Sequence, residues 1–331
     1  MRQSELLDQA NGEGERVPKR SLSRAVPLAM ALMGLGSPAA TPLSPPSLLS
    51  QTGLYAAGGL VHASGVEPYS PRYPLWSDGA AKARWVYLPE GQKIDTSNPD
   101  AWAFPVGTKF WKQFSFHGRK VETRLIWKAT KATWVFATYA WQPDQRDAVL
   151  APETGLPNQV EIVPGKRHTI PSLADCNTCH TNGPVEILGF SALQLATDRD
   201  PLTPHAEPLL QGMVTLKTLA ASKRLQPDVE DSQVPIRAST PLARAVLGYL
   251  SANCGICHKQ EGPLKGTVPQ LKQLLVADPA HPRTILDTKT RKAILRHMSN
   301  RGGDQMPPLA TVLVDEAAVA LVRRWSRSGK P

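Results

Sequence analysis

All four cysteines of the 331-residue chain lie in two copies of one short motif. The copies are Cys176-Asn177-Thr178-Cys179-His180 and Cys254-Gly255-Ile256-Cys257-His258. In each copy, two thiols three residues apart can form thioethers with the vinyl groups of one haem, and the adjacent imidazole can bind its iron. The motifs therefore predict two covalently bound c-type haems, attached through Cys176, Cys179, Cys254 and Cys257 and ligated by His180 and His258.

Two other uses of paired cysteines explain the pattern less well. A disulfide is open to a secreted protein, but it does not require a histidine after the second cysteine. A zinc site usually separates its cysteine pairs by about 15–20 residues. Here 74 residues lie between Cys179 and Cys254, so the spacing favours haem attachment.

A methionine in a proline-rich segment is the predicted sixth ligand of the second haem. Met306 follows His258 by 48 residues, in the sequence Gln305-Met306-Pro307-Pro308-Leu309. A thioether on a stiff loop is a soft, neutral axial ligand that raises the reduction potential of the iron. The alternative is a buried core methionine. His297 and Met298 are weaker candidates, because both fit ordinary helix positions.

The sixth ligand of the first haem is less well defined. Four side chains are candidates, namely Met213, His205, His168 and His117, and an open coordination site is a further alternative. We select Met213 as the predicted ligand, although it shares an apolar stripe with Leu209, Leu210 and Leu216 that is equally typical of a core position. The identity of this ligand decides between a plain electron carrier and a haem that binds small molecules.

An aromatic, strand-rich region precedes the first motif, and seven of the eight tryptophans fall between Pro71 and Leu150. Its sequence runs predict strands at Arg84–Leu88, Lys109–Phe116, Val121–Trp127 and Thr133–Trp141. Turns are predicted at Glu90-Gly91, Val106-Gly107 and His117-Gly118. We expect a β-rich, sandwich-like domain with the tryptophans in a sheet-on-sheet core, and a ligand-binding aromatic box is the alternative.

Short helices separated by proline-rich loops are expected after Pro171. Candidate helices cover Gly189–Ala196 and Glu207–Lys223, and Gln226–Thr240 is an expected linker. Thr240 is a candidate N-cap, with Pro241 at the first helical position. Asp315 and Glu316 open a last helix that ends in arginines, so its charges complement the helix dipole at both ends.

Together these features predict an α+β multidomain fold in four parts. A signal peptide is expected over residues 1–40 and a β-rich domain over 41–170, followed by the segment and linker of the first haem over 171–239. An all-α cytochrome c domain with the second haem is expected over 240–331. The signal peptide is indicated by Lys19, Arg20 and Arg24, followed by an apolar run and small residues. It predicts a periplasmic or secreted protein, and no later stretch is long enough to cross a membrane.

The formal net charge of +10 bears on the kind of partner. Nucleic acids and anionic membranes are the usual partners of basic chains. Here the basic residues are scattered and form no run of five or six, so we expect no nucleic-acid partner. A basic face that docks an acidic redox protein is an open alternative.

The chain resembles two groups of proteins at these residues. From Thr240 to the end it is similar to a class I cytochrome c domain, with a helix entering the haem motif, a methionine loop and a closing helix. From about Tyr73 onward it resembles a family of secreted bacterial dihaem c-type cytochromes. The wider resemblance rests on Pro74–Asp78, Phe104–Thr108, Glu122–Leu125, Tyr139–Trp141, Cys176–His180, Ile187–Phe190, Asn253–His258 and Met306–Leu309.

The motifs and the resemblance together predict periplasmic electron transfer between two haems and a redox partner protein. Two other classes stay open. One is a dihaem enzyme, such as a peroxidase or an oxidoreductase subunit, in which an open first haem performs the reaction. The other is a ligand-binding β domain that is coupled to a redox module.

Overall fold

The computed structural model describes residues 43–98, 102–180, 187–229, 236, 238–258 and 288–328. The expected signal peptide over residues 1–40 lies outside these ranges, as do parts of the expected linker. Contacts within the chain separate residues 1–41 from residues 42–331, and every described residue belongs to the second unit. Within the described part, no helix combines the length and the apolar character that a membrane span requires.

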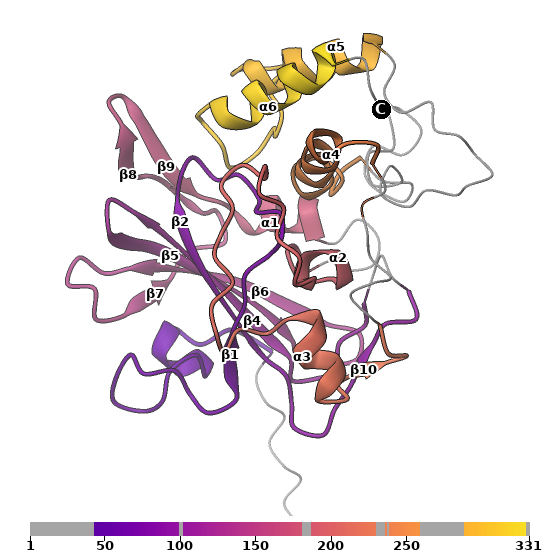
Figure 1. The fold of residues 1–331 in the computed structure, drawn as a ribbon. Coiled ribbons are helices and arrows are strands. Elements are labelled where there is room, and N and C mark those ends of the chain that lie inside the picture. The colour runs from indigo at the N-terminus through magenta and orange to yellow at the C-terminus, as the bar shows by residue number, and fades with distance from the viewer. Residues whose placement is uncertain are drawn as a thin grey trace, which may run out of the picture. The chain divides into compact units, whose positions relative to one another are not determined.

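A six-stranded antiparallel sheet is the largest element (Figure 1). Its strands are β1 Val66–Pro68, β2 Ala81–Tyr87, β4 Lys109–Phe116, β5 Arg119–Lys128, β6 Trp134–Trp141 and β7 Ala148–Leu150, paired in that order. The four predicted strands coincide with β2, β4, β5 and β6 and are confirmed. The turn at His117-Gly118 is also confirmed, because both residues have positive φ, 50° and 75°, as a two-residue hairpin loop of this kind requires.

Both edge strands of this sheet are protected from pairing with a further strand. Leu48, just before the short 3₁₀ helix Leu49–Thr52, forms an antiparallel bridge to Val149 of β7. Beside it, the amide of Leu150 donates to the carbonyl of Ser47 at 2.9 Å. At the opposite edge, β1 ends at Pro68, which has no N–H to offer a further strand. Unpaired edges invite pairing with another chain, and the segment ahead of β1 covers the β7 edge.

Both faces of the sheet are buried, because successive side chains point to opposite faces. One face packs against residues ahead of β1, in a cluster that includes Leu49, Leu54, Trp85, Trp111, Leu125 and Tyr139. The other face packs against residues 187–225, in a cluster that includes Val86, Phe110, Phe190, Leu195, Leu216 and Leu219. The prediction of a sheet-on-sheet sandwich is therefore wrong. Short helices and loops cover each face, and an alternating strand pattern is the same whatever covers it.

Two small sheets and six short helices complete the described part. β3 Ile94–Asp95 pairs in parallel with β10 Leu225–Gln226, and β8 Leu156–Val163 pairs antiparallel with β9 Lys166–Ile170. The helices are α1 Leu173–His180, α2 Ala192–Leu195, α3 Leu216–Ala221, α4 Pro241–Asn253, α5 Thr288–Ser299 and α6 Glu316–Arg327. Thr240 caps α4 as predicted, since its side chain accepts from the amide of Ala243 at 3.1 Å.

The predicted α+β multidomain fold with an all-α cytochrome c domain over 240–331 is wrong. The structure is β-rich and only 24% helical, and the described residues of this region show no such domain. They form α4, α5 and α6, which share a core that includes Val246, Leu250, Val319, Val322 and Trp325. Another side of α4 packs Leu247 against Tyr73, which precedes β2. The helical pattern identified the helices, but it could not show that α4 also packs against the β-rich part.

α4 approaches Tyr73 so closely that residue 248 has no room for a side chain. A Cβ built on Gly248 would lie 2.1 Å from Cε1 of the Tyr73 ring. The ring is only 1% exposed, and its hydroxyl contacts Asp200 Oδ2 at 3.4 Å. Gly248 therefore permits the contact that joins α4 to the segment before β2.

Gly248→Ala is expected to lower the free energy of unfolding by about 1–3 kcal/mol, because an added methyl group over-packs a filled site. Without this contact the same change would stabilise a helix interior by about 1 kcal/mol, so the sign is diagnostic. Denaturant unfolding measures the effect. Gly303→Ala is the control, since no atom lies within 4 Å of the added carbon. A more stable Gly248→Ala variant would contradict the close contact.

Candidate functional site

Both cysteine-histidine motifs open into one pocket of about 280 Å³. Its lining includes all four cysteines, His180, His258 and Met306. These side chains come from α1, from the turn after α4 and from the loop between α5 and α6. We call this the four-cysteine pocket. Two motifs that are distant in the sequence therefore share one site.

The first motif lies in α1, whose start is fixed by Ser172 and Asp175. The Ser172 hydroxyl accepts from the amide of Asp175 at 3.1 Å, and the Asp175 carboxylate accepts from the amide of Ser172 at 2.9 Å. This reciprocal arrangement satisfies two amides at the start of a helix. At the end of α1, the His180 ring lies 5.4 Å from the ring of Phe136 on β6, measured between centroids. The imidazole is therefore placed against the sheet.

The second motif forms the turn that ends α4. The amides of Cys254 and Gly255 both donate to the carbonyl of Leu250, at 2.8 and 2.9 Å, and the amide of His258 donates to the carbonyl of Cys254 at 3.0 Å. A Cβ on Gly255 would lie 2.7 Å from the carbonyl oxygen of Ser251. The close approach of the backbone therefore requires glycine between the two cysteines.

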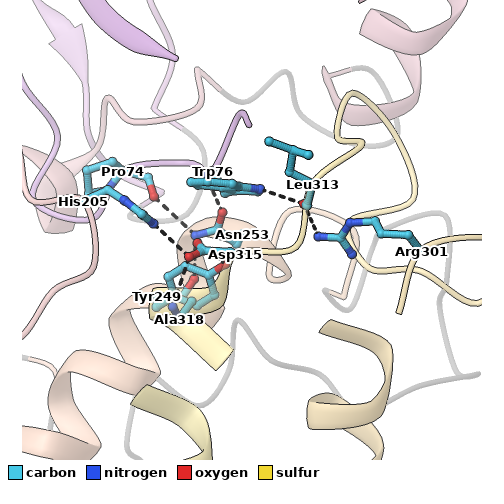
Figure 2. Close-up of polar contacts among 9 residues, drawn as sticks. All are labelled: Pro74, Trp76, His205, Tyr249, Asn253, Arg301, Leu313, Asp315 and Ala318. Carbon is cyan, nitrogen blue, oxygen red and sulfur yellow. Dashed lines mark hydrogen bonds and ion pairs between the residues drawn. The ribbon is translucent and has the colours of Figure 1, made fainter. Parts of the chain in front are cut away.

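Asn253, the last residue of α4, joins the second motif to the segment before β2 (Figure 2). Its Oδ1 accepts from the amide of Trp76 at 2.7 Å, and its Nδ2 donates to the carbonyls of Pro74 at 3.3 Å and Tyr249 at 3.0 Å. Asn253 is 6% exposed, so these bonds form in a low-dielectric environment that strengthens them. Because Cys254 is the next residue, this carboxamide positions the second motif.

Asp315 at the start of α6 gathers three donors in the same region (Figure 2). Its carboxylate accepts from Nε2 of His205 at 2.8 Å, from the hydroxyl of Tyr249 at 3.0 Å and from the amide of Ala318 at 3.0 Å. Asp315 is 3% exposed, and a buried carboxylate needs such partners. Two of these bonds join α6 to α4 and to the loop ahead of α3, and the third caps the first turn of α6.

The loop that carries Met306 is held by the carboxamide of Gln305. Its Nε2 donates to the carbonyls of Pro307 at 3.2 Å and Thr311 at 3.1 Å, and its Oε1 accepts from the amide of Gly302 at 3.2 Å. The amide of Met306 donates to the carbonyl of His297 at 3.1 Å. These bonds fix the loop on both sides of Met306, whose side chain lines the pocket.

Cys179 and Cys257, one from each motif, are in direct contact. A hydrogen bond between their thiols, together with burial, raises the pKa of Cys179. Burial raises the pKa of Cys254 to about 12 and also raises the pKa of Cys176. All four are free cysteines. Since the thiolate is the reactive form, the protonated thiols of Cys176, Cys179 and Cys254 are weak nucleophiles at neutral pH.

β5 places a fully buried carboxylate beside the pocket. Glu122 accepts from Arg124 Nη2 at 2.5 Å and Nε at 3.1 Å, and from Nε2 of His168 at 3.0 Å. Burial alone would raise the pKa of Glu122, but Arg124 and His168 lower it to about 2. Arg124 and His168 both line the four-cysteine pocket. The pocket wall therefore carries a guanidinium whose charge is balanced by a buried acid.

The candidate ligands of the first predicted haem are dispersed. Met213 is not among the residues that line the four-cysteine pocket, and its sulfur contacts the amide of Leu210 at 3.4 Å. His168 lines the pocket but is bonded to Glu122, and His205 is bonded to Asp315. The ring of His117 lies 3.1 Å from the carbonyl of Ile162 and belongs to the β4–β5 hairpin.

Of the candidates near the second motif, only Met306 lines the pocket. Nδ1 of His297 bonds to the carbonyl of Asp304 at 2.8 Å. Met298 is 5% exposed within the core shared by α4, α5 and α6. His297 and Met298 therefore occupy the ordinary helix positions that the sequence indicated for them.

The four-cysteine pocket does not fit the predicted pair of haems. Thiols from the two motifs contact each other, whereas two attachment sites would hold the cysteine pairs apart. Within the described ranges, no three His, Cys, Asp or Glu side chains group so as to hold a metal ion. The prediction of two covalently bound c-type haems is therefore wrong.

Sequence reasoning missed the residues that hold the pocket in place. The run containing Glu122 and Arg124 indicated a strand but not a site. A carboxylate and a guanidinium two residues apart, and so on the same face of a strand, could have signalled one, because such groups are almost never fully buried unless paired. Asn253 carried no signal beyond its position directly before Cys254, since its partners Pro74 and Trp76 are distant in the sequence.

Glu122→Gln is expected to lower the free energy of unfolding at pH 7 by about 3 kcal/mol, because Arg124 loses its buried counter-charge. Ionised Glu122 stabilises the fold above its unfolded pKa of about 4.3. That contribution is lost as the pH falls towards the folded pKa of about 2. The variant should therefore lose less stability than the native chain between pH 7 and pH 3, as measured by denaturant unfolding.

Glu161→Gln is the matched control, because Glu161 forms an exposed pair with Arg167 at 3.8 Å. Such a pair contributes less than about 1 kcal/mol, so this variant should retain the native stability and pH dependence. An unaltered pH dependence in Glu122→Gln would contradict the role assigned to the buried carboxylate.

Comparison with known proteins adds no assignment to this geometry. No family model, curated protein or solved structure matches the chain. The resemblance of the sequence to secreted dihaem cytochromes therefore stays a prediction, and the function has to be argued from the pocket itself.

Proposed function

We propose that the chain transfers electrons to and from a partner protein, and that the four-cysteine pocket is its redox site. The observation that carries the proposal is the meeting of both cysteine-histidine motifs with Met306 in one pocket. Thiols are themselves redox-active at cellular potentials, because a pair of them can be oxidised to a disulfide. Three separate segments supply the sulfur and imidazole groups of the pocket, and each is fixed by its own hydrogen bonds.

The protonation of the thiols favours an electron carrier over a hydrolase. Nucleophilic catalysis by cysteine depends on a lowered pKa, which an adjacent imidazolium or helix N-terminus provides. Here burial and the contact between thiols raise the pKa of Cys176, Cys179 and Cys254. His168, one of the three histidines that line the pocket, is bonded to Glu122 rather than to a thiol.

The contact between Cys179 and Cys257 offers one route that uses only the atoms of this chain. Loss of two electrons and two protons joins the two sulfurs in a disulfide, and a partner disulfide that accepts them becomes a dithiol. The raised pKa of Cys179 slows this exchange at neutral pH, because the thiolate is the attacking species. A test of the proposal therefore measures the oxidation state of the thiols and the absorption of any bound chromophore separately.

A redox titration of the purified chain at pH 7 is expected to show a reversible wave. Visible absorption reports a chromophore bound in the pocket, and alkylation of thiols followed by mass measurement reports a cysteine pair. The double variant Cys179→Ser with Cys257→Ser should abolish the wave or displace its midpoint. No reversible wave by either readout, or a wave that is identical in the double variant, would overturn the proposal.

Met306→Leu is expected to shift the midpoint potential, because it removes the thioether from the pocket lining while keeping a similar side-chain volume. Met213→Leu makes the same chemical change away from the pocket and should leave the midpoint unchanged. Equal shifts in both variants would show that the effect is general to the fold and would contradict the placement of the redox site.

A further inference from the structure

One face of the main sheet carries four cations on three adjacent strands. Arg84 of β2 pairs with Lys112 of β4, and Lys112 pairs with Arg124 of β5. Lys82 lies two residues before Arg84 and therefore on the same face. We call these four residues the cationic row. Like charges directly opposite each other destabilise a sheet, so this arrangement requires a compensating interaction.

The acidic side chains that face the cationic row balance only part of its positive charge. Glu207 accepts from both terminal nitrogens of Arg84, including Nη2 at 3.0 Å, and Glu122 accepts from Arg124. Among the described residues, Lys82 and Lys112 form no ion pair. The charge of Glu207 acts on both Lys82 and Lys112, and the charges of Asp315 and Asp78 act on Lys82. Each of these carboxylates accepts hydrogen bonds from other groups.

The ring of Phe114 offers Lys112 and Arg124 a weaker contact. Nζ of Lys112 lies 4.9 Å from the ring centroid, and Cζ of Arg124 lies 4.4 Å from it. Such cation–π contacts are weaker than a buried ion pair. Burial, with the neighbouring cations, lowers the pKa of Lys82 to about 8 and the pKa of Lys112 well below its ordinary value. Burial and the neighbouring cations thus disfavour the ammonium form of both lysines, and a bound anion would favour it.

The cationic row adjoins the four-cysteine pocket. Arg124 and its strand neighbour Ile126 line the pocket, and the register of β4 places Lys112 beside Arg124. The pocket lining close to Arg124 is otherwise largely apolar and includes Ile126 and Phe136. A molecule that fills the pocket therefore contacts apolar side chains and Arg124. The other three residues of the cationic row lie beyond Arg124 on β4 and β2 and do not line the pocket.

We propose that the cationic row binds an oxyanion, a carboxylate or phosphate group, that belongs to the ligand of the four-cysteine pocket. Arg124 and Arg84 are oriented by Glu122 and Glu207, and Lys112 and Lys82 supply the unbalanced charge. The ligand class is thus an apolar molecule with an acidic group. This inference concerns binding and does not depend on electron transfer.

Isothermal titration of the full chain with inorganic phosphate, at constant ionic strength set with chloride, tests the oxyanion site. Lys112→Gln is expected to weaken phosphate binding about tenfold or more, since a charge-assisted contact is lost. Lys131→Gln removes the same charge from an exposed turn and should leave the affinity unchanged. Lys112→Gln should also raise the thermal stability of the phosphate-free chain, because it removes an amine whose charged form is disfavoured by burial and by the neighbouring cations.

A comparison of octanoate with 1-octanol separates a free anion from the acidic group of a pocket ligand. The native chain should bind octanoate about tenfold more tightly than 1-octanol, and Lys112→Gln should abolish that preference. Phosphate binding without a preference for octanoate would overturn the link to the pocket. No phosphate binding, equal losses in Lys112→Gln and Lys131→Gln, or a Lys112→Gln variant that is less stable but binds normally would overturn the oxyanion site itself.

Discussion

The shared pocket depends on the hydrogen bonds that the carboxamide of Asn253 forms. It meets a backbone donor, the amide of Trp76, and two backbone acceptors, the carbonyls of Pro74 and Tyr249. A carboxamide offers both a carbonyl oxygen and an NH₂ group, and a carboxylate of the same shape offers no donor. Because Cys254 follows directly, the position of the second motif relative to the segment before β2 is set by this one side chain.

The sheet and the helices contribute different chemistry to the same site. The segments around α1, α4 and α6 supply sulfur and imidazole groups, held by Asp175, Asn253 and Gln305. The sheet supplies charge, in the form of a buried carboxylate and a row of cations. A strand suits this role because its neighbours hold a fixed register, so that Arg84, Lys112 and Arg124 cannot separate without breaking the ladder.

The strands, the caps and the turn at His117 could be predicted from the sequence, because alternation, N-cap residues and hairpin glycines act over a few residues. The residues that cover the sheet could not be predicted, because Phe190 and Leu216 are distant from β4 in the sequence and yet pack on it. The motifs located the sulfur groups of the site, but not their convergence. The contact of Cys179 with Cys257 depends on the long-range bonds of Asn253 and Asp315, which no local pattern encodes.

The protected edge of β7 has a consequence for proteolytic processing of the chain. Ser47 and Leu48 occupy the backbone groups of Leu150 and Val149 that would otherwise face solvent. A cleavage that leaves these two residues in place keeps the edge closed. A protease that trims a few residues further would expose a free strand edge, and exposed edges of this kind recruit strands from other molecules. Removal of the chain up to and beyond Leu48 would therefore change its colloidal behaviour.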